Sequence, residues 1–164
     1  DMSIKQIMGK IKKYNCNLIE VTGGEPLIQE ECIPLMKLLL KNNYQVMLET
    51  SGSLSIKAVP KKVIKIIDFK CPSSKMHKKN DWAIIEDLQK HDEIKFVIGD
   101  KKDYIWTKNK IKQYDLYDKN LLFSPIHDLL DPKTLSTWVL NDALKVRVQL
   151  QLHKYIWSPD TKGV

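Results

Sequence analysis

The sequence predicts an α/β fold in which parallel strands alternate with crossover helices. Segments with helical periodicity alternate with short strand-like segments along the whole chain. The strand-like segments are short and apolar, as is typical of parallel strands that are covered on both faces. No internal repeat or low-complexity linker interrupts the 164 residues, so we expect a single domain over residues 1–164.

The expected strands are short runs enriched in β-branched, aromatic or other apolar residues, bounded by turn formers. In chain order, they are residues 18–22, 45–50, 62–70, 93–99, 121–125 and 145–151.

The expected helices follow capping signals and a period near 3.6 residues. Ser3 can cap the first helix, Pro34 is tolerable only in the first turn of the second, and Asn80 or Asp81 can cap the third. In chain order, the helices are residues 3–14, 30–42, 81–90, 101–114 and 132–142.

Composition and charge narrow the function classes. The formal net charge is +7, which favours anionic partners. Almost all of the positive charge is lysine, which is more typical of solvated helix faces than of a nucleic-acid surface, so we expect no nucleic-acid partner. No apolar run reaches the length of a membrane span and the N-terminal residues lack a signal-peptide core, so we expect a cytoplasmic protein without a membrane partner.

The three cysteines, Cys16, Cys32 and Cys71, match neither a disulfide framework nor a zinc motif. We expect Cys16 and Cys32 to be buried packing residues. Cys71 has no histidine base beside it in the sequence, so we expect a non-catalytic thiol.

Polar loops follow the predicted strands. These loops are TGGEP, ETSGS, DFKCPSS, FSPIHD and QLHKY. Ligands of parallel α/β folds gather at the carboxyl ends of the strands, whereas the loops at the opposite end, such as KNNY, are merely hydrophilic. This asymmetry predicts an active-site face.

Each loop alone also has an ordinary structural interpretation. TGGEP is equally consistent with a strand-to-helix turn and with a backbone cradle for a ligand. ETSGS can be a simple turn, and Asp68 and Lys70, which point outward if Phe69 points inward, can be a surface ion pair. His127 and His153 are lone histidines, but His153 follows the last strand, close to the other loops.

Taken together, the loops resemble the 7-carboxy-7-deazaguanine synthase family, which belongs to the radical S-adenosylmethionine enzymes. The resemblance runs in order through VTGGEP, LETSG, DFKCPSSKM, EIKFVI and QLQLHKYIWSPDTKGV, and so covers nearly the whole chain. GGEP is shared by many radical S-adenosylmethionine enzymes, whereas KCPSSKM and LQLHKYIW narrow the resemblance to this family.

The resemblance implies a partial (β/α) barrel and a ring contraction. In that reaction 6-carboxy-5,6,7,8-tetrahydropterin becomes 7-carboxy-7-deazaguanine with loss of ammonia. A [4Fe-4S] cluster, S-adenosylmethionine and Mg²⁺ serve as cofactors, and queuosine is one product of the pathway. The resemblance further implies a homodimer.

The resemblance also implies site residues. Those for S-adenosylmethionine are Gly23, Gly24, Glu25, Ser51, Asp68, Phe69, Lys70 and Ser124. Those for the pterin are Thr22, His153 and the C-terminal Val164. Asp68-Phe69-Lys70 stands where many members have Ser-Pro-Lys, and Ser124 stands where some have Gln.

The chain departs from the family in its cysteines. The family holds its cluster with three cysteines in one CxxxCxxC-like loop after the first strand, and this sequence contains no such loop. We therefore expect an N-terminally truncated domain without the first strand, the cluster loop and the Mg²⁺ ligand, with one sheet edge unpaired. The same reasoning predicts that this chain alone holds no cluster and shows no turnover.

Two other functions fit parts of the sequence. One is a radical S-adenosylmethionine activase of a glycyl-radical enzyme, against which the tail LQLHKYIW argues. The other is a non-catalytic basic α/β module that binds RNA, which predicts salt-sensitive RNA affinity.

Overall fold

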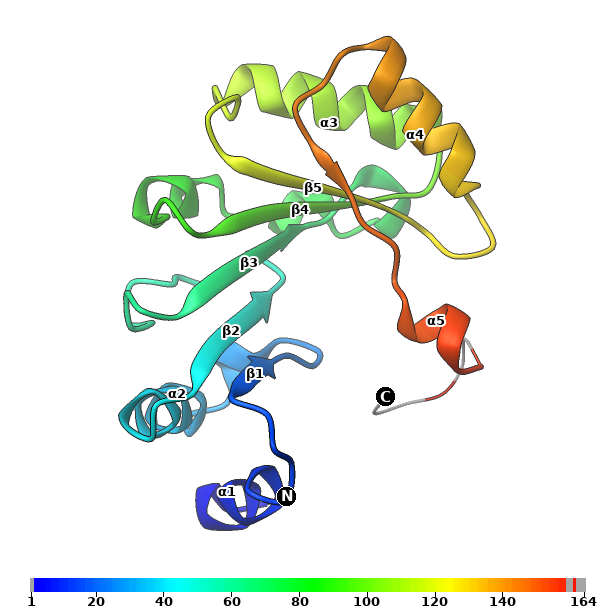
Figure 1. The fold of residues 1–164 in the computed structure, drawn as a ribbon. Coiled ribbons are helices and arrows are strands. Elements are labelled where there is room, and N and C mark those ends of the chain that lie inside the picture. The colour runs from blue at the N-terminus through cyan, green and yellow to red at the C-terminus, as the bar shows by residue number, and fades with distance from the viewer. Residues whose placement is uncertain (1, 159–160, 162–164) are drawn as a thin grey trace.

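In a computed structural model, residues 2–158 and 161 are described, and they form one open sheet flanked by helices (Figure 1). The helices are α1 (Ile4–Ile11), α2 (Cys32–Lys41), α3 (Lys101–Gln113), α4 (Pro132–Asn141) and α5 (His153–Ile156). The strands are β1 (Leu18–Val21), β2 (Gln45–Thr50), β3 (Ile64–Phe69), β4 (Glu93–Ile98), β5 (Asn120–Pro125) and β6 (Arg147–Val148). Four 3-10 helices are η1 (Pro26–Ile28), η2 (Pro72–Ser74), η3 (His77–Lys79) and η4 (Trp82–Asp87).

The sheet of the described residues has the strand order β1-β2-β3-β4-β5-β6, and every neighbouring pair is parallel. Strands that follow one another in sequence are therefore neighbours in space, with their carboxyl ends at one edge. β1 and β6 are the two outer strands and do not pair with each other, so the sheet is open. The expected α/β class and the open arrangement of parallel strands are confirmed.

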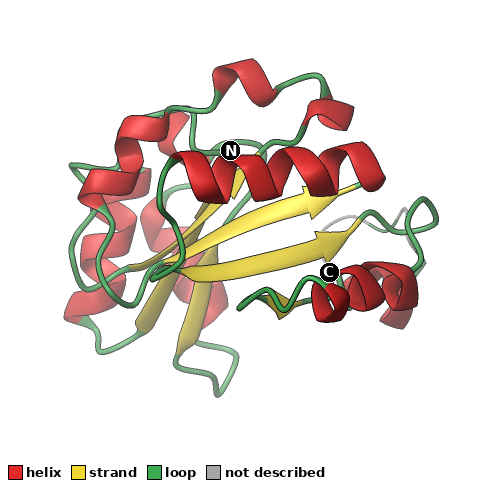
Figure 2. Cartoon of the chain, turned by 90° about the horizontal axis from the view of Figure 1, so that it is seen from above, coloured by secondary structure: helices red, strands yellow, loops and turns green. Residues whose placement is uncertain are grey.

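The hydrophobic core lies on the helix-covered face of the sheet. Side chains alternate between the two faces of a strand, and one set is apolar and fully buried, including Leu48, Phe69, Phe96 and Phe123. Figure 2 shows helices packed along this sheet. The alternate positions on the other face mix polar and apolar residues, namely Met47, Glu49, Ile66, Glu93, Lys95, Leu122 and Ser124.

Local signals explain several helix boundaries. Ser3 and Gln6 form a reciprocal capping box at the start of α1, and Pro34 lies in the first turn of α2. The buried side chains Met36 and Leu39 lie on the inner face of α2, as the helical periodicity predicts. No helix among the described residues combines the length and apolar character needed to cross a membrane.

Two element predictions differ from the structure. Residues 81–90 were expected to form an α-helix, but only the 3-10 helix η4 forms there, because Trp82 and Ile84 pack inward and Asp81 caps Ala83. The strand expected over residues 145–151 pairs with β5 only at Arg147 and Val148, and the chain then leaves the sheet.

Candidate functional site

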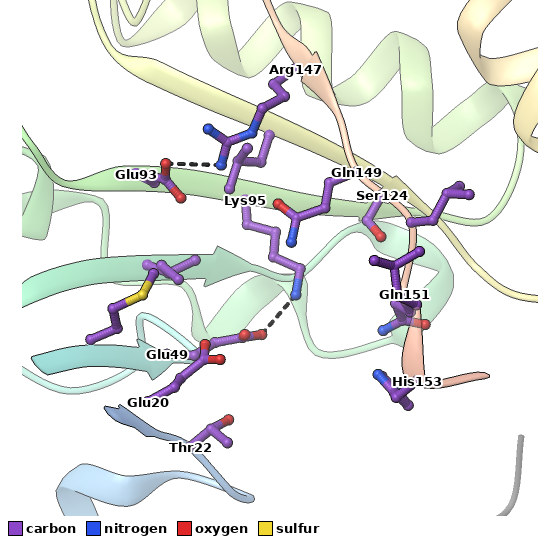
Figure 3. Close-up of a pocket in the computed structure, with 15 residues that line it drawn as sticks. Glu20, Thr22, Glu49, Glu93, Lys95, Ser124, Arg147, Gln149, Gln151 and His153 are labelled. Carbon is purple, nitrogen blue, oxygen red and sulfur yellow. Dashed lines mark hydrogen bonds and ion pairs between the residues drawn. The ribbon is translucent and has the colours of Figure 1, made fainter. Parts of the chain in front are cut away.

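A cavity of about 470 Å³ opens on the polar face of the sheet. Its walls come from β1 to β6 and from the segment that leads into α5 (Figure 3). The lining residues are Glu20, Thr22, Met47, Glu49, Ile66, Glu93, Lys95, Leu122, Ser124, Arg147, Gln149, Leu150, Gln151, Leu152 and His153. Three of the residues expected at the site, Thr22, Ser124 and His153, are in this lining, and the cavity is large enough for a small organic molecule.

The loop after β1 leaves its backbone open. Gly23 has a φ of +153° and Gly24 has no positive φ. A Cβ built at either glycine meets no described heavy atom within 4 Å, so the protein's own packing does not require glycine at residue 24. An exposed backbone without Cβ atoms suits close approach by a ligand.

Glu25 connects this loop to the end of β2. Its carboxylate accepts hydrogen bonds from the Ser51 amide at 2.8 Å, from the Ser51 hydroxyl at 2.6 Å and from the Thr50 hydroxyl. It also accepts one from the amide of Leu27, at the start of η1. Burial alone would raise the pKa of Glu25, but these hydrogen bonds outweigh it and lower the pKa below its ordinary value.

Asp68, Phe69 and Lys70 alternate as the sequence predicts. The Phe69 side chain is fully buried on the helix side, with its ring centroid 4.4 Å from that of Trp82, so only its backbone can face a ligand. Lys70 Nζ lies 2.7 Å from Asp68 Oδ2 on the other side. Asn80 holds the Lys70 backbone by two hydrogen bonds, which fixes the strand end.

Two polar atoms on this side of the sheet are buried without a partner. Asp68 Oδ1 and Ser124 Oγ make no hydrogen bond with any described residue, although their residues are only 7% and 1% exposed. Burial raises the pKa of Asp68 despite the nearby ammonium groups of Lys70 and Lys95. Unpaired buried polar atoms are costly, and of these two residues Ser124 lines the cavity.

The most prominent charges of the cavity were not identified from the sequence. Lys95 Nζ lies 2.8 Å from Glu49 Oε1, and Arg147 Nη2 lies 2.9 Å from Glu93 Oε1. Lys95 is only 9% exposed, although it sits in the apolar run EIKFVI. Glu93 and Lys95 are two residues apart in β4, so their side chains lie on the same face of the strand. Two charges at this spacing were the signal that could have shown that one face of the strand is polar.

Thr22 and His153 line the same cavity from opposite ends of the chain. The Tyr155 ring of α5 contacts the His127 ring edge-on, with centroids 4.9 Å apart, and this contact anchors α5 near His153. Val164 lies outside the described residues. The structure thus brings together both remaining residues expected to contact a substrate.

The cysteines lie in three separate places. Cys32 is buried as expected, but the expectation for Cys16 is wrong, because Cys16 is exposed in the loop before β1. Burial raises the pKa of Cys71 to about 12, so its thiol is not a nucleophile near neutral pH. No group of three or more His, Cys, Asp or Glu residues within the described part of the chain could hold a metal ion. These residues therefore do not fit a [4Fe-4S] cluster.

The fold is similar to that of SuiB from Streptococcus suis, solved bound to S-adenosylmethionine. The TM-score is 0.60 at 12% identity, and the similarity covers 92% of this chain and 42% of SuiB. This likeness supports the fold. No protein-family model matches the chain.

Comparison of sequences identifies the family. The chain is 42% identical to the 7-carboxy-7-deazaguanine synthase of Koribacter versatilis, over 99% of this chain and 79% of the relative. It is 38% identical to the enzyme of the same name from Chlorobaculum tepidum, over 99% of this chain and 76% of the relative. The match therefore spans the whole sheet and its loops, and the chain belongs to the 7-carboxy-7-deazaguanine synthase family.

Proposed function

We propose that the protein acts as a 7-carboxy-7-deazaguanine synthase. In this function 6-carboxy-5,6,7,8-tetrahydropterin is contracted to 7-carboxy-7-deazaguanine with loss of ammonia, a carbon–nitrogen lyase reaction in queuosine and deazapurine biosynthesis. The observation that carries the proposal is that Thr22 and His153, which the family resemblance assigns to the pterin, line one cavity together with Ser124.

The strand-end loops are proposed to bind S-adenosylmethionine. When bound, this cofactor supplies the radical chemistry of hydrogen abstraction. The open backbone at Gly23 and Gly24 would receive its amino-acid end, and the Glu25–Ser51 hydrogen bonds hold the two loops that form the seat. Asp68 Oδ1 and Ser124 Oγ, which lack described partners, would complete the polar contacts.

The chain's charged residues are proposed to orient the pterin. The cavity offers ammonium and guanidinium groups, from Lys95 and Arg147, to a substrate that carries a carboxylate. Gln149 and Gln151 add amide donors and acceptors for the polar edge of a heterocycle. These fixed groups would hold the substrate before any bond is broken.

The ligands for the [4Fe-4S] cluster and Mg²⁺ are proposed to lie outside these 164 residues. The curated relatives are longer than the matched region, which spans 79% and 76% of the two relatives described above. The proposal includes the inactivity of this chain alone, a cytoplasmic location and a homodimer. Sedimentation of the intact protein as a monomer would contradict the dimer.

The function is tested under anaerobic conditions with a synthase that contains this chain together with a cluster-binding segment. Carboxytetrahydropterin, S-adenosylmethionine and a reductant should yield 7-carboxy-7-deazaguanine, detected by mass spectrometry. An intact cluster without product would overturn the proposed function. The 164-residue chain, treated with iron and sulfide, serves as the comparison, and a stable cluster with turnover there would overturn its proposed inactivity.

A further inference from the structure

Two glutamates extend from neighbouring strands into the cavity. The register of β1 and β2 places Glu20 opposite Met47, so Glu49 is its diagonal neighbour on the same face. Figure 3 shows the carboxyl groups of Glu20 and Glu49 side by side, with Lys95 reaching the far side of Glu49. Two carboxyl groups and one ammonium group therefore form a row across β1, β2 and β4.

The ammonium group in this row is that of Lys95, and it forms an ion pair with Glu49. Lys95 Nζ lies 2.8 Å from Glu49 Oε1, and the two side chains are 11% and 25% exposed. No ion pair among the described residues includes Glu20. The pair is asymmetric, because the cation stabilises the negative charge of Glu49 and leaves Glu20 as the member that holds a proton more easily.

The pKa of Glu20 agrees with this asymmetry. Burial raises it, and so do the negative charge of Glu49 and a hydrogen bond with the Glu49 carboxyl group, while Lys95 opposes the rise and Glu93 adds to it. Among the described residues Glu20 lies on an outer strand, with its side chain exposed.

The other charged groups around the cavity have partners of their own. On β4 and β6, Glu93 pairs with Arg147 at 2.9 Å, and at the end of β3, Asp68 pairs with Lys70 at 2.7 Å. His153, at the start of α5, is the remaining titratable group that lines the cavity. Glu20 is therefore the carboxyl group of the lining without a cation among the described residues.

We propose that Glu20 is a general acid of this site and that Glu49, held by Lys95, is the residue that positions its proton. The inference rests on the proposed function, in which a nitrogen atom leaves the substrate as ammonia. An amine leaves poorly as an anion, so a proton donor beside the departing nitrogen lowers the barrier.

The proposed step is redox-neutral and balanced. The carbon–nitrogen bond breaks with its electron pair going to nitrogen, and the Glu20 proton completes ammonia. The neighbouring carbon–hydrogen bond gives its electron pair to a new carbon–carbon double bond, and its proton returns to the Glu20 carboxylate. Glu20 ends the step protonated, and the substrate has lost one molecule of ammonia.

The pairing is tested on the 164-residue chain by NMR titration of glutamate side-chain carboxyl carbons. Glu20 should titrate above the ordinary glutamate range, and the Glu49→Gln substitution should lower the pKa of Glu20 while leaving the part of the rise that burial causes. Lys95→Met should raise the pKa of Glu20 further, because Lys95 opposes the rise. Glu20 titrating in the ordinary range, or independently of residue 49, would overturn the pairing.

The catalytic role is tested in the reconstituted synthase by comparing Glu20→Gln with Glu31→Gln. Glu31 is exposed and makes no side-chain capping hydrogen bond, so its substitution is the matched control. Glu20→Gln should lower kcat about 100-fold or more with little change in KM. Wild-type activity should fall as the pH rises above the pKa of Glu20. The activity that remains in Glu20→Gln should not show this fall. Glu20→Asp should keep part of the activity, and that activity should again fall as the pH rises.

The outcomes separate the two proposals. Wild-type enzyme that forms no product overturns the proposed function. Active wild-type enzyme, with a Glu20→Gln variant of equal kcat and unchanged pH profile, overturns only the role of Glu20. Circular dichroism of each variant shows whether the fold is retained.

Discussion

The carboxylate of Glu25 accepts two hydrogen bonds from Ser51, one from the backbone amide at 2.8 Å and one from the hydroxyl at 2.6 Å. Residues of two different strand-end loops are thereby joined, so the seat proposed for the cofactor is fixed before a ligand arrives. A carboxylate with several donors is a strong acceptor, and its loss leaves those donors without a partner.

Glu25→Ala should lower the free energy of unfolding by about 2–3 kcal/mol at neutral pH, because hydrogen bonds to a charged group are lost. Urea unfolding measures the change, and Glu31→Ala, at an exposed residue, should stay within about 0.5 kcal/mol. Equal effects of the two substitutions would contradict a special role for Glu25.

The stabilisation by Glu25 should depend on pH in a defined direction. The pKa of Glu25 is lower in the folded chain than its ordinary value of 4.5, so the stabilisation is complete above that value. It should decline as the pH falls through the folded pKa, when the carboxylate gains a proton. The difference in unfolding free energy between wild type and Glu25→Ala should therefore shrink in acid.

Gly52→Ala should destabilise the fold by about 2–4 kcal/mol. Gly52 has a φ of +67°, and an added Cβ would lie 2.7 Å from Ile67 Cγ2 and 2.9 Å from Phe69 Cε1, both in the buried core. Thermal or urea unfolding measures the loss. A variant as stable as the wild type would show that the loop after β2 can move away from the sheet.

Gly24→Ala should separate binding from stability. Because no described atom lies within 4 Å of the added Cβ, the unfolding free energy should change by no more than about 0.5 kcal/mol. Affinity for S-adenosylmethionine in the reconstituted synthase, measured by calorimetry, should fall. Gly9→Ala, in the exposed part of α1, is the control that should leave this affinity unchanged. Equal affinity in wild type, Gly24→Ala and Gly9→Ala would contradict the proposal that the S-adenosylmethionine site includes Gly24.

Much of the architecture follows from sequence patterns, because both strand period and loop chemistry are local. The alternation of Asp68, Phe69 and Lys70 at the end of β3 was predicted correctly from their polarity alone. Both Glu25 and Ser51 were expected at the site from their loops, but the hydrogen bonds between them were not predicted. A hydrogen bond between residues far apart in sequence is visible only after the strands are placed side by side.

The remaining differences arise where tertiary contacts override local preference. η4 forms in place of a longer helix because Trp82 is held between Phe69 and Tyr114, with centroid distances of 4.4 Å to each. Lys95 was missed because an apolar strand was expected to be apolar on both faces, whereas one face of this sheet lines a cavity. Cys16 lies in a loop, where an apolar neighbourhood in the sequence does not guarantee burial.

The last prediction concerns a buried ion pair on the opposite face of the sheet from the cavity. Lys65 Nζ lies 2.9 Å from Asp92 Oδ2, and their side chains are 3% and 0% exposed. Asp92 also accepts hydrogen bonds from the amides of Lys65 and Gln89. Lys65→Met should therefore cost about 3–5 kcal/mol of unfolding free energy, because it leaves a buried carboxylate without its cation.

In a double-mutant cycle with Asp92→Asn, the combined loss should be smaller than the sum of the single losses, because the amide keeps an acceptor for the backbone and carries no charge. Lys119→Met, which breaks the more exposed 3.5 Å pair with Asp118, is the control and should cost less than about 1 kcal/mol. Additive losses in the cycle would mean that Lys65 stabilises the fold through its packing, and not through its charge.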